Sequence, residues 1–421
     1  MDIKVIPSKL SGAITVPPSK SAAHRAIIAA ALAEGESIIQ NVDLSSDIRA
    51  TIGACEQLGC TVEIAEAEPF CTLTIRGGLK PQNGALIDCA ESGSTLRFMI
   101  PVACTQTGER TFTGRRRLPQ RPIDSYLQIF DEQGIPYNRP YGANLPLTIS
   151  GALKPGKFRM DGRVSSQFVT GLLYALPLLD GDSQIEVIGG FESRGYVDLT
   201  VDMLRRFGVV IGSEGDRFLI SGSQVYKPQR IAVEGDWSQA AFFLVAGAIS
   251  GGVRVAGFDG NSLQPDSVIV ELLMRMGADI SWEGDEFVSA PVRLQGIEID
   301  VSQCPDLVPP LAIAAAFAQG TTHITGAARL RIKESDRLSA LAQNLNALGI
   351  KAEEQPDGLT IHGGTMAGGE VDSFGDHRIA MAFSIAAAVS RQGIVIRGAQ
   401  CVDKSYPKFF EDFTGLGGKT E

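Results

Sequence analysis

A repeat of about 70 residues runs through this 421-residue chain and constrains its fold more than any single motif does. Five times an amphipathic stretch ends in a glycine and leads into a short alternating segment, and a sixth copy is degenerate. The repeated glycines, separated by 75, 74, 69, 72 and 68 residues, are Gly59, Gly134, Gly208, Gly277, Gly349 and Gly417. Each glycine stands where a helix C-cap would give way to a strand. The spacing therefore predicts six copies of one α/β unit.

A second series of stretches, rich in Ala, Leu and Ile and headed by polar residues, alternates with the first. These stretches end at Gly35, Gly108, Gly181, Gly252, Gly320 and Gly393. Each predicts a buried helix, and strand-like runs such as Val253–Val255 follow them. We therefore expect two helices and three or four strands in each unit.

Six such units could stack as an open solenoid or close as two groups of three. Solenoid repeats are usually shorter and end in atypical polar caps, whereas the ends of this chain are not obviously capped. We therefore predict two groups of three units, with the polar-headed helices inside each group and their N-termini directed to a common face. The join is expected near Gly235.

The composition excludes several classes of protein. Hydrophobic residues make up 44% and charged residues 20%, which is typical of a globular protein. No apolar run reaches the roughly 18 residues of a membrane span, and the N-terminus lacks the layout of a signal peptide, so we expect a cytoplasmic protein. A net charge of −10 argues against nucleic acid or an anionic membrane as the partner. The seven cysteines form neither a CxxC pair nor a disulfide framework, which predicts reduced thiols.

The polar heads of the six predicted buried helices are the candidate binding groups. They are Ser19-Lys20-Ser21, Ser92-Gly93-Ser94-Thr95, Ser165-Ser166-Gln167, Asp236-Trp237-Ser238, Pro305-Asp306 and Asp376-His377-Arg378. Any single head is explained more simply as a helix N-cap, because Ser and Asp are the usual capping residues. Several helix N-termini at one face would nevertheless present free N–H groups and partial positive charge to an anion.

Cationic side chains recur at the heads and in the loops before the second helices. They are Lys20, Arg25, Arg97, Arg121, Lys333, Arg337, Arg378 and Lys404. Guanidinium groups bind phosphate and carboxylate in a bidentate manner, and lysine adds a mobile charge. The set therefore predicts ligands that carry both phosphate and carboxylate groups.

Five motifs, in order along essentially the whole chain, match a known family. They are Pro17-Pro18-Ser19-Lys20-Ser21 with Arg25, Arg121-Pro122, Ser165-Ser166-Gln167, Arg331-Ile332-Lys333-Glu334-Ser335-Asp336-Arg337 and Asp376-His377-Arg378. Together they resemble the EPSP synthase (3-phosphoshikimate 1-carboxyvinyltransferase) family. The resemblance implies two inside-out α/β domains, each of three repeated units with buried parallel helices and outer sheets. We place one domain at residues 18–233 and the other at residues 1–17 plus 234–421.

The resemblance also implies a reaction of the shikimate pathway, which leads to chorismate and the aromatic amino acids. The enolpyruvyl group of phosphoenolpyruvate would move to the 5-hydroxyl of shikimate 3-phosphate, with release of phosphate and without a metal or organic cofactor. The expected contacts of shikimate 3-phosphate are Lys20, Ser21, Arg25, Ser165, Ser166, Gln167, Ser193, Tyr196, Asp306 and Lys333. Those of phosphoenolpyruvate are Lys20, Gly93, Arg121, Gln167, Arg337, His377, Arg378 and Lys404. These two small molecules are the expected partners of a monomeric enzyme.

Such a transfer needs a base for the attacking hydroxyl, an acid for the vinyl carbon and cations for the departing phosphate. Asp306 is the best candidate for the base. Glu334 is the natural candidate for the acid, although Lys20 could share that role, so all three are expected catalytic residues. For His377, orientation of its neighbours and proton transfer both stay open.

Two positions depart from the pattern of the family. Glu91 stands where many members have an asparagine before the head of the helix, and Arg329 occupies a position that is often asparagine. The contacts of those amides are therefore not carried over. Gly417–Thr420 resembles a phosphate loop superficially, but it lacks the upstream glycine and a following helix, so we expect a tail.

The closest alternative is the related enzyme that transfers enolpyruvate to UDP-N-acetylglucosamine. That enzyme usually has a reactive cysteine a few residues before the arginine that corresponds to Arg121, and residues 113–120 contain none. A non-catalytic anion-binding protein of the same fold is a second alternative, against which Asp306, Glu334 and Lys20 count. Because basic residues come from both halves, we also expect the domains to close on shikimate 3-phosphate.

Overall fold

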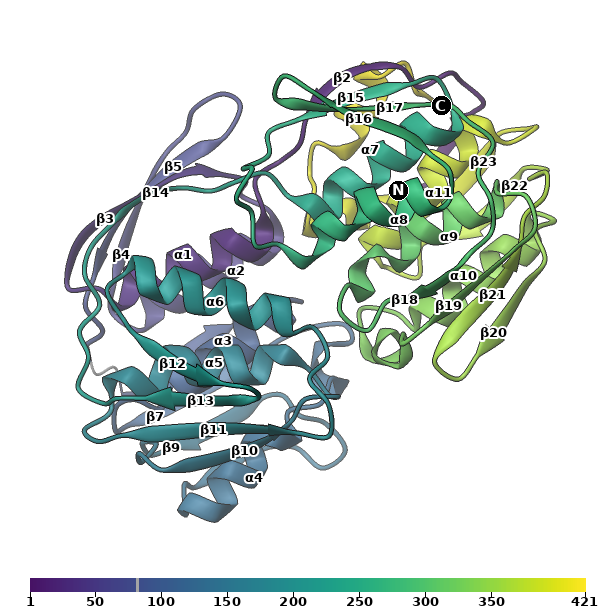
Figure 1. Ribbon diagram of the computed structural model, residues 1–421. Coiled ribbons are helices and arrows are strands. Elements are labelled where there is room, and N and C mark those ends of the chain that lie inside the picture. Colours follow the sequence, from purple (N-terminus) through teal and green to yellow (C-terminus); the bar gives the residue numbers. More distant parts are fainter. Residues whose placement is uncertain (81–82) are drawn as a thin grey trace. The chain divides into compact units, whose positions relative to one another are not determined.

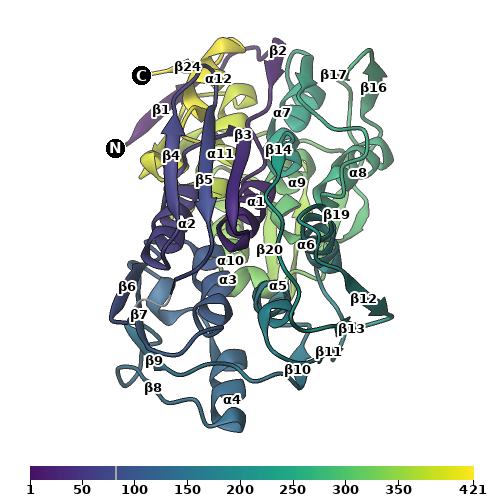
Figure 2. The ribbon, with the colours of Figure 1, turned by 90° about the vertical axis from the view of Figure 1, so that its left-hand side faces the viewer.

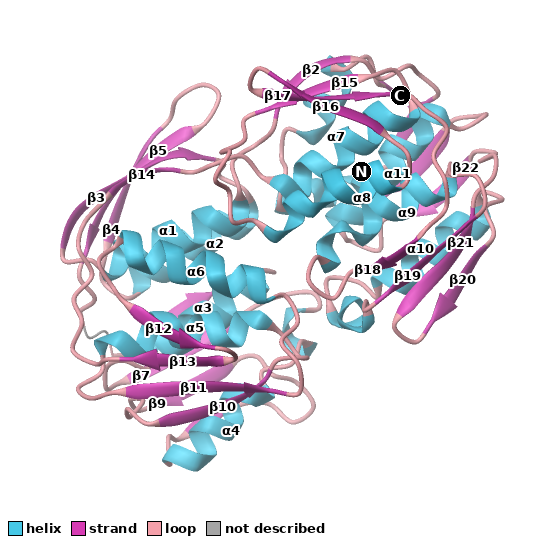
Figure 3. Cartoon of the chain, in the orientation of Figure 1, coloured by secondary structure: helices cyan, strands magenta, loops and turns pink. Residues whose placement is uncertain are grey.

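The computed structural model describes residues 1–80 and 83–421, which divide into two compact units. Unit 1 consists of Met1–Pro17 and Glu234–Glu421, and unit 2 consists of Pro18–Val233. Figure 1 shows the chain coloured along the sequence, and Figure 3 shows the same view coloured by secondary structure. Within each unit the sheets lie outside a group of buried helices (Figure 3). Among the described residues, no helix is both long enough and apolar enough to span a membrane.

Unit 2 is built around three buried helices, α1 (Lys20–Leu32), α3 (Gly93–Ala103) and α5 (Ser166–Ala175). Its amphipathic helices are α2 (Ser46–Gln57), α4 (Asp124–Gln133) and α6 (Arg194–Arg206), and 3-10 turns lie at Leu118–Gln120 and Leu176–Leu178. Its strands are β3 (Gly35–Val42), β4 (Thr61–Ala65), β5 (Cys71–Gly77), β6 (Ala85–Asp88), β7 (Glu109–Thr113), β8 (Tyr137–Asn138), β9 (Leu147–Ser150), β10 (Lys157–Asp161), β11 (Ser183–Ile188), β12 (Ile211–Glu214), β13 (Arg217–Ile220) and β14 (Arg230–Ala232).

Unit 1 repeats this plan around α7 (Trp237–Ile249), α9 (Val308–Ala316) and α11 (His377–Val389), which pack against one another. Its other helices are α8 (Ile269–Arg275), α10 (Arg337–Ala347) and α12 (Phe409–Gly415), with 3-10 turns at Pro265–Val268, Pro305–Leu307, Ala328–Ile332 and Ala399–Lys404. Its strands are β1 (Ile3–Ile6), β2 (Gly12–Thr15), β15 (Val253–Ala256), β16 (Asp279–Glu283), β17 (Glu286–Ala290), β18 (Glu298–Asp300), β19 (Thr321–Thr325), β20 (Ala352–Gln355), β21 (Gly358–His362), β22 (Gly369–Asp372), β23 (Ile394–Arg397) and β24 (Lys419–Thr420).

The described residues form six four-stranded sheets with one topology. In each sheet one edge strand, here called the first strand, pairs parallel with its neighbour, and the remaining pairs are antiparallel. In β10-β11-β13-β12, for example, Phe158 is opposite Ile185 and Ile185 is opposite Phe218. Figure 2 shows β4, β5, β3 and β14 side by side in one of these sheets. The prediction of two helices and three or four strands in each copy of the repeat is therefore confirmed, with four strands in each sheet.

Two sheets take their first strand from a distant part of the chain. β14 directly precedes α7 of unit 1, yet it pairs with β3 of unit 2, where Arg230 is opposite Ile38. β2 directly precedes α1 of unit 2, yet it pairs with β15 of unit 1, where Gly12 is opposite Val253. The first and fourth copies of the repeat have therefore exchanged their first strands.

The sheet of the last repeat is completed by the two ends of the chain. β1 pairs antiparallel with both β23 and β24, and Val5 is opposite Thr420. Lys419–Thr420, part of the expected tail at residues 417–420, is therefore the edge strand β24. That prediction was wrong because strand pairing with residues 3–6 is non-local.

Local sequence explains the helices and their ends. The central helices are buried on nearly all sides because their residues are apolar or small all round, and α1 is buried from Ala22 to Leu32. The six repeated glycines follow their helices with φ between 67° and 103°, as predicted for C-terminal caps. All seven cysteines are free thiols, and only Cys71 is not buried.

Candidate functional site

The heads of the central helices are mostly N-caps. Ser19, Ser92, Ser165, Asp236 and Asp376 each accept a hydrogen bond from a backbone N–H in the first turn of their helix. The head of α9 differs from these five, because Pro305–Leu307 forms a 3-10 turn before the helix and Asp306 does not cap it. The carboxylate of Asp306 is thereby directed to other partners.

In unit 2, the first head holds two cations in buried polar surroundings. Lys20 Nζ lies 2.9 Å from Asp47 Oδ2, and the exposed fractions of these side chains are 17% and 6%. The Arg25 guanidinium donates to Thr200 Oγ1 at 2.9 Å and to the carbonyls of Ser21 and Tyr196 at 2.8 and 2.7 Å. These bonds tie α1 to α6 and fix the orientation of Arg25.

The heads of α3 and α5 are joined by an arginine and an amide. Arg97 donates from Nη1 to Gln167 Oε1 at 2.8 Å, and Gln167 Nε2 donates to Ser94 Oγ at 2.9 Å. The Arg121 guanidinium covers Gly93 so closely that a Cβ at Gly93 would lie 2.5 Å from Arg121 Nη1. Gly93 therefore permits the close approach of Arg121 that any larger residue would obstruct.

The remaining predicted residues of unit 2 lie at the starts of α5 and α6. Ser165 caps α5 and Ser166 and Gln167 begin it, whereas Ser193 precedes α6 with a left-handed φ of 53° and Tyr196 lies in its first turn. Because the Tyr196 carbonyl accepts from Arg25, the start of α6 is bonded to α1.

In unit 1, Asp306 is surrounded by cations. Its Oδ1 lies 2.8 Å from Arg337 Nη1 and 3.5 Å from Lys333 Nζ, and its Oδ2 lies 3.5 Å from Arg378 Nη2. Burial raises the pKa of Asp306, but Arg378, Lys333 and Arg337 together hold it well below the ordinary value for a carboxyl. Asp306 is therefore ionised in this structure and can accept a proton.

Glu334 belongs to the same network. Its Oε2 lies 3.0 Å from Arg337 Nη2 and its Oε1 lies 3.5 Å from Lys404 Nζ. Although burial lowers the pKa of Arg337, the carboxylates of Asp376, Glu334 and Asp306 raise it overall, so this guanidinium is firmly cationic. His377 begins α11 and is buried, with Nδ1 3.8 Å from Asp376 Oδ1.

Two buried carboxylates that are not among the expected substrate contacts orient these groups. Asp376 is fully buried and accepts from Arg337 Nε at 2.8 Å, from Ser335 Oγ at 3.1 Å and from the backbone N–H of Arg378 at 3.0 Å. In unit 2, Asp47 pairs with Lys20. The signal for Asp376 was its place in the Asp-His-Arg motif, and that for Asp47 was an acidic residue in the first turn of an amphipathic helix.

The two departures from the family pattern each have a structural partner. Glu91 Oε1 lies 3.1 Å from Arg116 Nε, so its charge is paired with a cation of the loop that leads to Arg121. Arg329 Nη2 donates to the carbonyl of Ser302 at 2.9 Å. Both replacements thus make contacts within their own unit.

Known proteins resemble this chain along nearly its whole length. A model of the family described as EPSP synthase (3-phosphoshikimate 1-carboxyvinyltransferase) matches residues 5–413. The chain belongs to the EPSP synthase family. It is 49% identical to the 3-phosphoshikimate 1-carboxyvinyltransferase of Clostridium kluyveri over 100% of this chain and 98% of that protein. It is 48% identical to that of Clostridium acetobutylicum over 99% of this chain and 97% of the relative.

Two solved structures share the fold of this chain. EPSP synthase from Acinetobacter baumannii matches with a TM-score of 0.82 and 30% identity, covering 100% of this chain and 99% of that chain. The enolpyruvyl transferase NikO from Streptomyces tendae has a TM-score of 0.79 over 100% of this chain and 98% of its own, but it is only 18% identical and supports the fold alone. The predicted family and the predicted α/β fold are therefore confirmed.

Proposed function

We propose that this EPSP synthase family member transfers the enolpyruvyl group of phosphoenolpyruvate to the 5-hydroxyl of shikimate 3-phosphate. Near-complete coverage by curated 3-phosphoshikimate 1-carboxyvinyltransferases supports this reaction. The observation that carries it is the network of unit 1, in which Asp306 and Glu334 share Arg337. Two carboxylates for proton transfer thereby lie beside cations suited to a phosphate.

The two units supply different parts of the chemistry. In unit 2 we assign Lys20, Ser21, Arg25, Ser165, Ser166, Gln167, Ser193 and Tyr196 to shikimate 3-phosphate, and Lys20, Gly93, Arg121 and Gln167 to phosphoenolpyruvate. In unit 1 we assign Asp306 and Lys333 to shikimate 3-phosphate, and Arg337, His377, Arg378 and Lys404 to phosphoenolpyruvate. Both ligands are anionic, and these sets contain most of the buried cations of the two clusters.

The proposed reaction has two steps, and its protons balance. Asp306 accepts the proton of the 5-hydroxyl while that oxygen bonds to C2 of phosphoenolpyruvate, and C3 gains a proton to become a methyl group. Phosphate then leaves C2 with the electrons of the C–O bond, while the methyl group returns a proton to the group that supplied it, which restores the double bond. The proton on Asp306 passes to the departing phosphate. Either Glu334 in its protonated form or Lys20 supplies the proton to C3. Arg337 and Lys404 contact Glu334 in this structure, so a bound phosphate would compete with it for both cations.

An assay of phosphate release tests the reaction and its acceptor. We expect phosphate when the protein is mixed with phosphoenolpyruvate and shikimate 3-phosphate, and none when UDP-N-acetylglucosamine replaces shikimate 3-phosphate. Release with the nucleotide sugar alone would favour the related enzyme, although residues 113–120 lack the cysteine it usually has. Binding of both ligands without release would favour a non-catalytic protein.

A further inference from the structure

Helix α2 contributes none of the proposed substrate contacts, yet buried polar side chains bond it to α1. Asp47 and Thr51 lie four residues apart on α2 and therefore on one face of that helix. Asp47 Oδ2 lies 2.9 Å from Lys20 Nζ, and Thr51 Oγ1 lies 2.7 Å from His24 Nδ1. Lys20 and His24 are also four residues apart, so two successive polar pairs join α1 to α2.

The same face of α2 reaches the head of α3. Thr51 Oγ1 lies 2.7 Å from Thr95 Oγ1, and the Thr95 hydroxyl lies 2.8 Å from Ser92 Oγ and 3.5 Å from the carbonyl of Asp47. Ser92 accepts from the Thr95 N–H at 3.1 Å and caps α3. The hydrogen-bonded chain from His24 therefore ends one residue before Gly93.

This polar chain lies in the hydrophobic core, where a polar group without a partner is costly. His24 is 1% exposed, and Thr51, Thr95 and Ser92 are 0% exposed. Burial lowers the pKa of His24 to about 3, so its imidazole is neutral near pH 7. Each hydroxyl has a single proton, so the tautomer of that imidazole sets the donor direction along the whole chain. The tautomer of His24 thus determines whether His24 donates to Thr51 or accepts from it.

We propose that α2 is a positioning element. Asp47 and the hydrogen-bonded series His24–Thr51–Thr95–Ser92 hold Lys20 and Gly93 in the positions that binding of phosphoenolpyruvate requires. The inference rests on the proposed function, because Lys20 and Gly93 are the assigned contacts of that ligand. Asp47 and Thr51 act through other residues and touch no substrate. A valine would fill the place of either threonine, so what the hydroxyls add is directional bonding between helices.

Substitutions that differ only in one hydroxyl test this role. Thr51→Ser keeps the hydroxyl and Thr51→Ala removes it, and both lack the methyl group. We expect T51A to raise the KM for phosphoenolpyruvate about three- to tenfold relative to T51S, which is the size expected for one hydrogen bond. The KM for shikimate 3-phosphate should change little. Asp47→Asn should also raise the KM for phosphoenolpyruvate and lower kcat, because the charged partner of Lys20 is lost.

A buried threonine of unit 1 provides the control. Thr322 of β19 is 0% exposed, and Thr322→Val should keep the wild-type KM for both substrates. Calorimetric titration with phosphoenolpyruvate in the presence of shikimate 3-phosphate, with Asp306→Asn added to both variants so that the two ligands do not react, should show weaker binding to T51A than to T51S. Equal affinities and equal KM values for these two variants, with only the melting temperature changed, would overturn the positioning role. A wild-type protein that binds both ligands but releases no phosphate would contradict the proposed reaction, and the titration would still decide the role of α2.

Discussion

At the scale of single residues, Asp306 combines two properties that oppose each other. Arg378, Lys333 and Arg337 keep it ionised, but a carboxylate whose pKa is held so low is a weak base. The phosphate and carboxylate groups of the substrates would pair with the same cations. We expect the pKa of Asp306 to rise when they bind, toward a value better suited to accept a proton.

Asp306→Asn tests the assignment of the base. The amide cannot accept the hydroxyl proton, so kcat should fall by about 10²- to 10⁴-fold, the usual contribution of general acid–base catalysis. The rate of phosphate release at saturating substrate measures this loss. Asp279→Asn, on an exposed position of β16, is the matched control and should keep the wild-type rate. Full activity of D306N would exclude Asp306 as the base.

The buried His24 should make the stability of the fold depend on pH. Its pKa is about 3 in the folded chain because of burial, whereas an ordinary histidine has a pKa of 6.5. Between these values the unfolded chain binds the extra proton, so His24 reduces the free energy of unfolding as the pH falls below 6.5. The slope is about 1.4 kcal/mol per pH unit. Urea unfolding from pH 6 to pH 4 should therefore show a steeper loss for wild type than for His24→Asn, and parallel curves would contradict this.

At the scale of elements, the start of α3 depends on the absence of a side chain. Gly93→Ala should not weaken the helix, because alanine has the higher helix propensity and Gly93 has no left-handed φ. Its Cβ would instead displace Arg121, whose Nη1, Cζ and Nη2 would lie 2.5 to 2.9 Å away. We expect the KM for phosphoenolpyruvate to rise at least about tenfold, as for a misplaced binding group, while the melting temperature is kept. Gly53→Ala, a helical glycine with an open Cβ position, should leave the KM unchanged.

At the scale of the whole molecule, the exchange of β2 and β14 makes the two units unequal as fragments. Residues 18–233 contain every strand of their three sheets, whereas residues 234–421 lack β1 and β2. A sheet without these strands leaves apolar surface and backbone groups unpaired. The fragment 18–233 should therefore unfold cooperatively on its own, and the fragment 234–421 should not.

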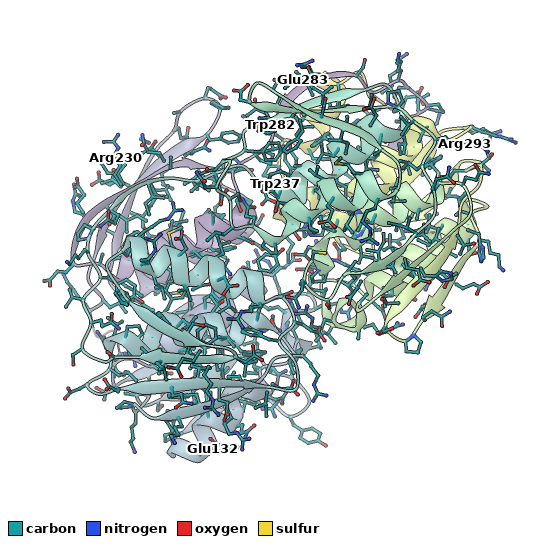
Figure 4. All side chains as sticks on the ribbon, in the orientation of Figure 1. Glu132, Arg230, Trp237, Trp282, Glu283 and Arg293 are labelled. Atoms are coloured by element: carbon teal, nitrogen blue, oxygen red, sulfur yellow. The ribbon has the colours of Figure 1, made fainter. Side chains whose placement is uncertain are left out.

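A rearranged chain provides the control for this prediction. Lys4 and Glu421 are bonded through their backbones at 2.8 and 3.0 Å, so a short linker can join residue 421 to residue 1. The product, with residues 1–17 placed after residue 421, should restore cooperative unfolding. Both tryptophans, Trp237 and Trp282, lie in unit 1 and pack against Phe287, so their fluorescence reports its folding (Figure 4). Cooperative unfolding of 234–421 alone would show that β1 and β2 are dispensable.

The sequence by itself determined the six-fold repeat, the helix ends at the repeated glycines and the family. These features are local: capping residues, apolar runs and motif spacing all act within a few turns of chain. The residues of the assigned site could be named from motifs for the same reason, because most stand at the starts of helices.

Only the tertiary structure decided which strands complete which sheet and which side chains meet. β2, β14 and β24 pair with residues that are distant in sequence, and strand pairing of that kind leaves no local signal. The same is true of Asp306, whose partners Arg337 and Arg378 come from other helices, and of Thr51, whose hydroxyl links α1 to α3. The sequence of one repeat specifies the helices and strands of that repeat, whereas contacts between repeats depend on packing that no single copy contains.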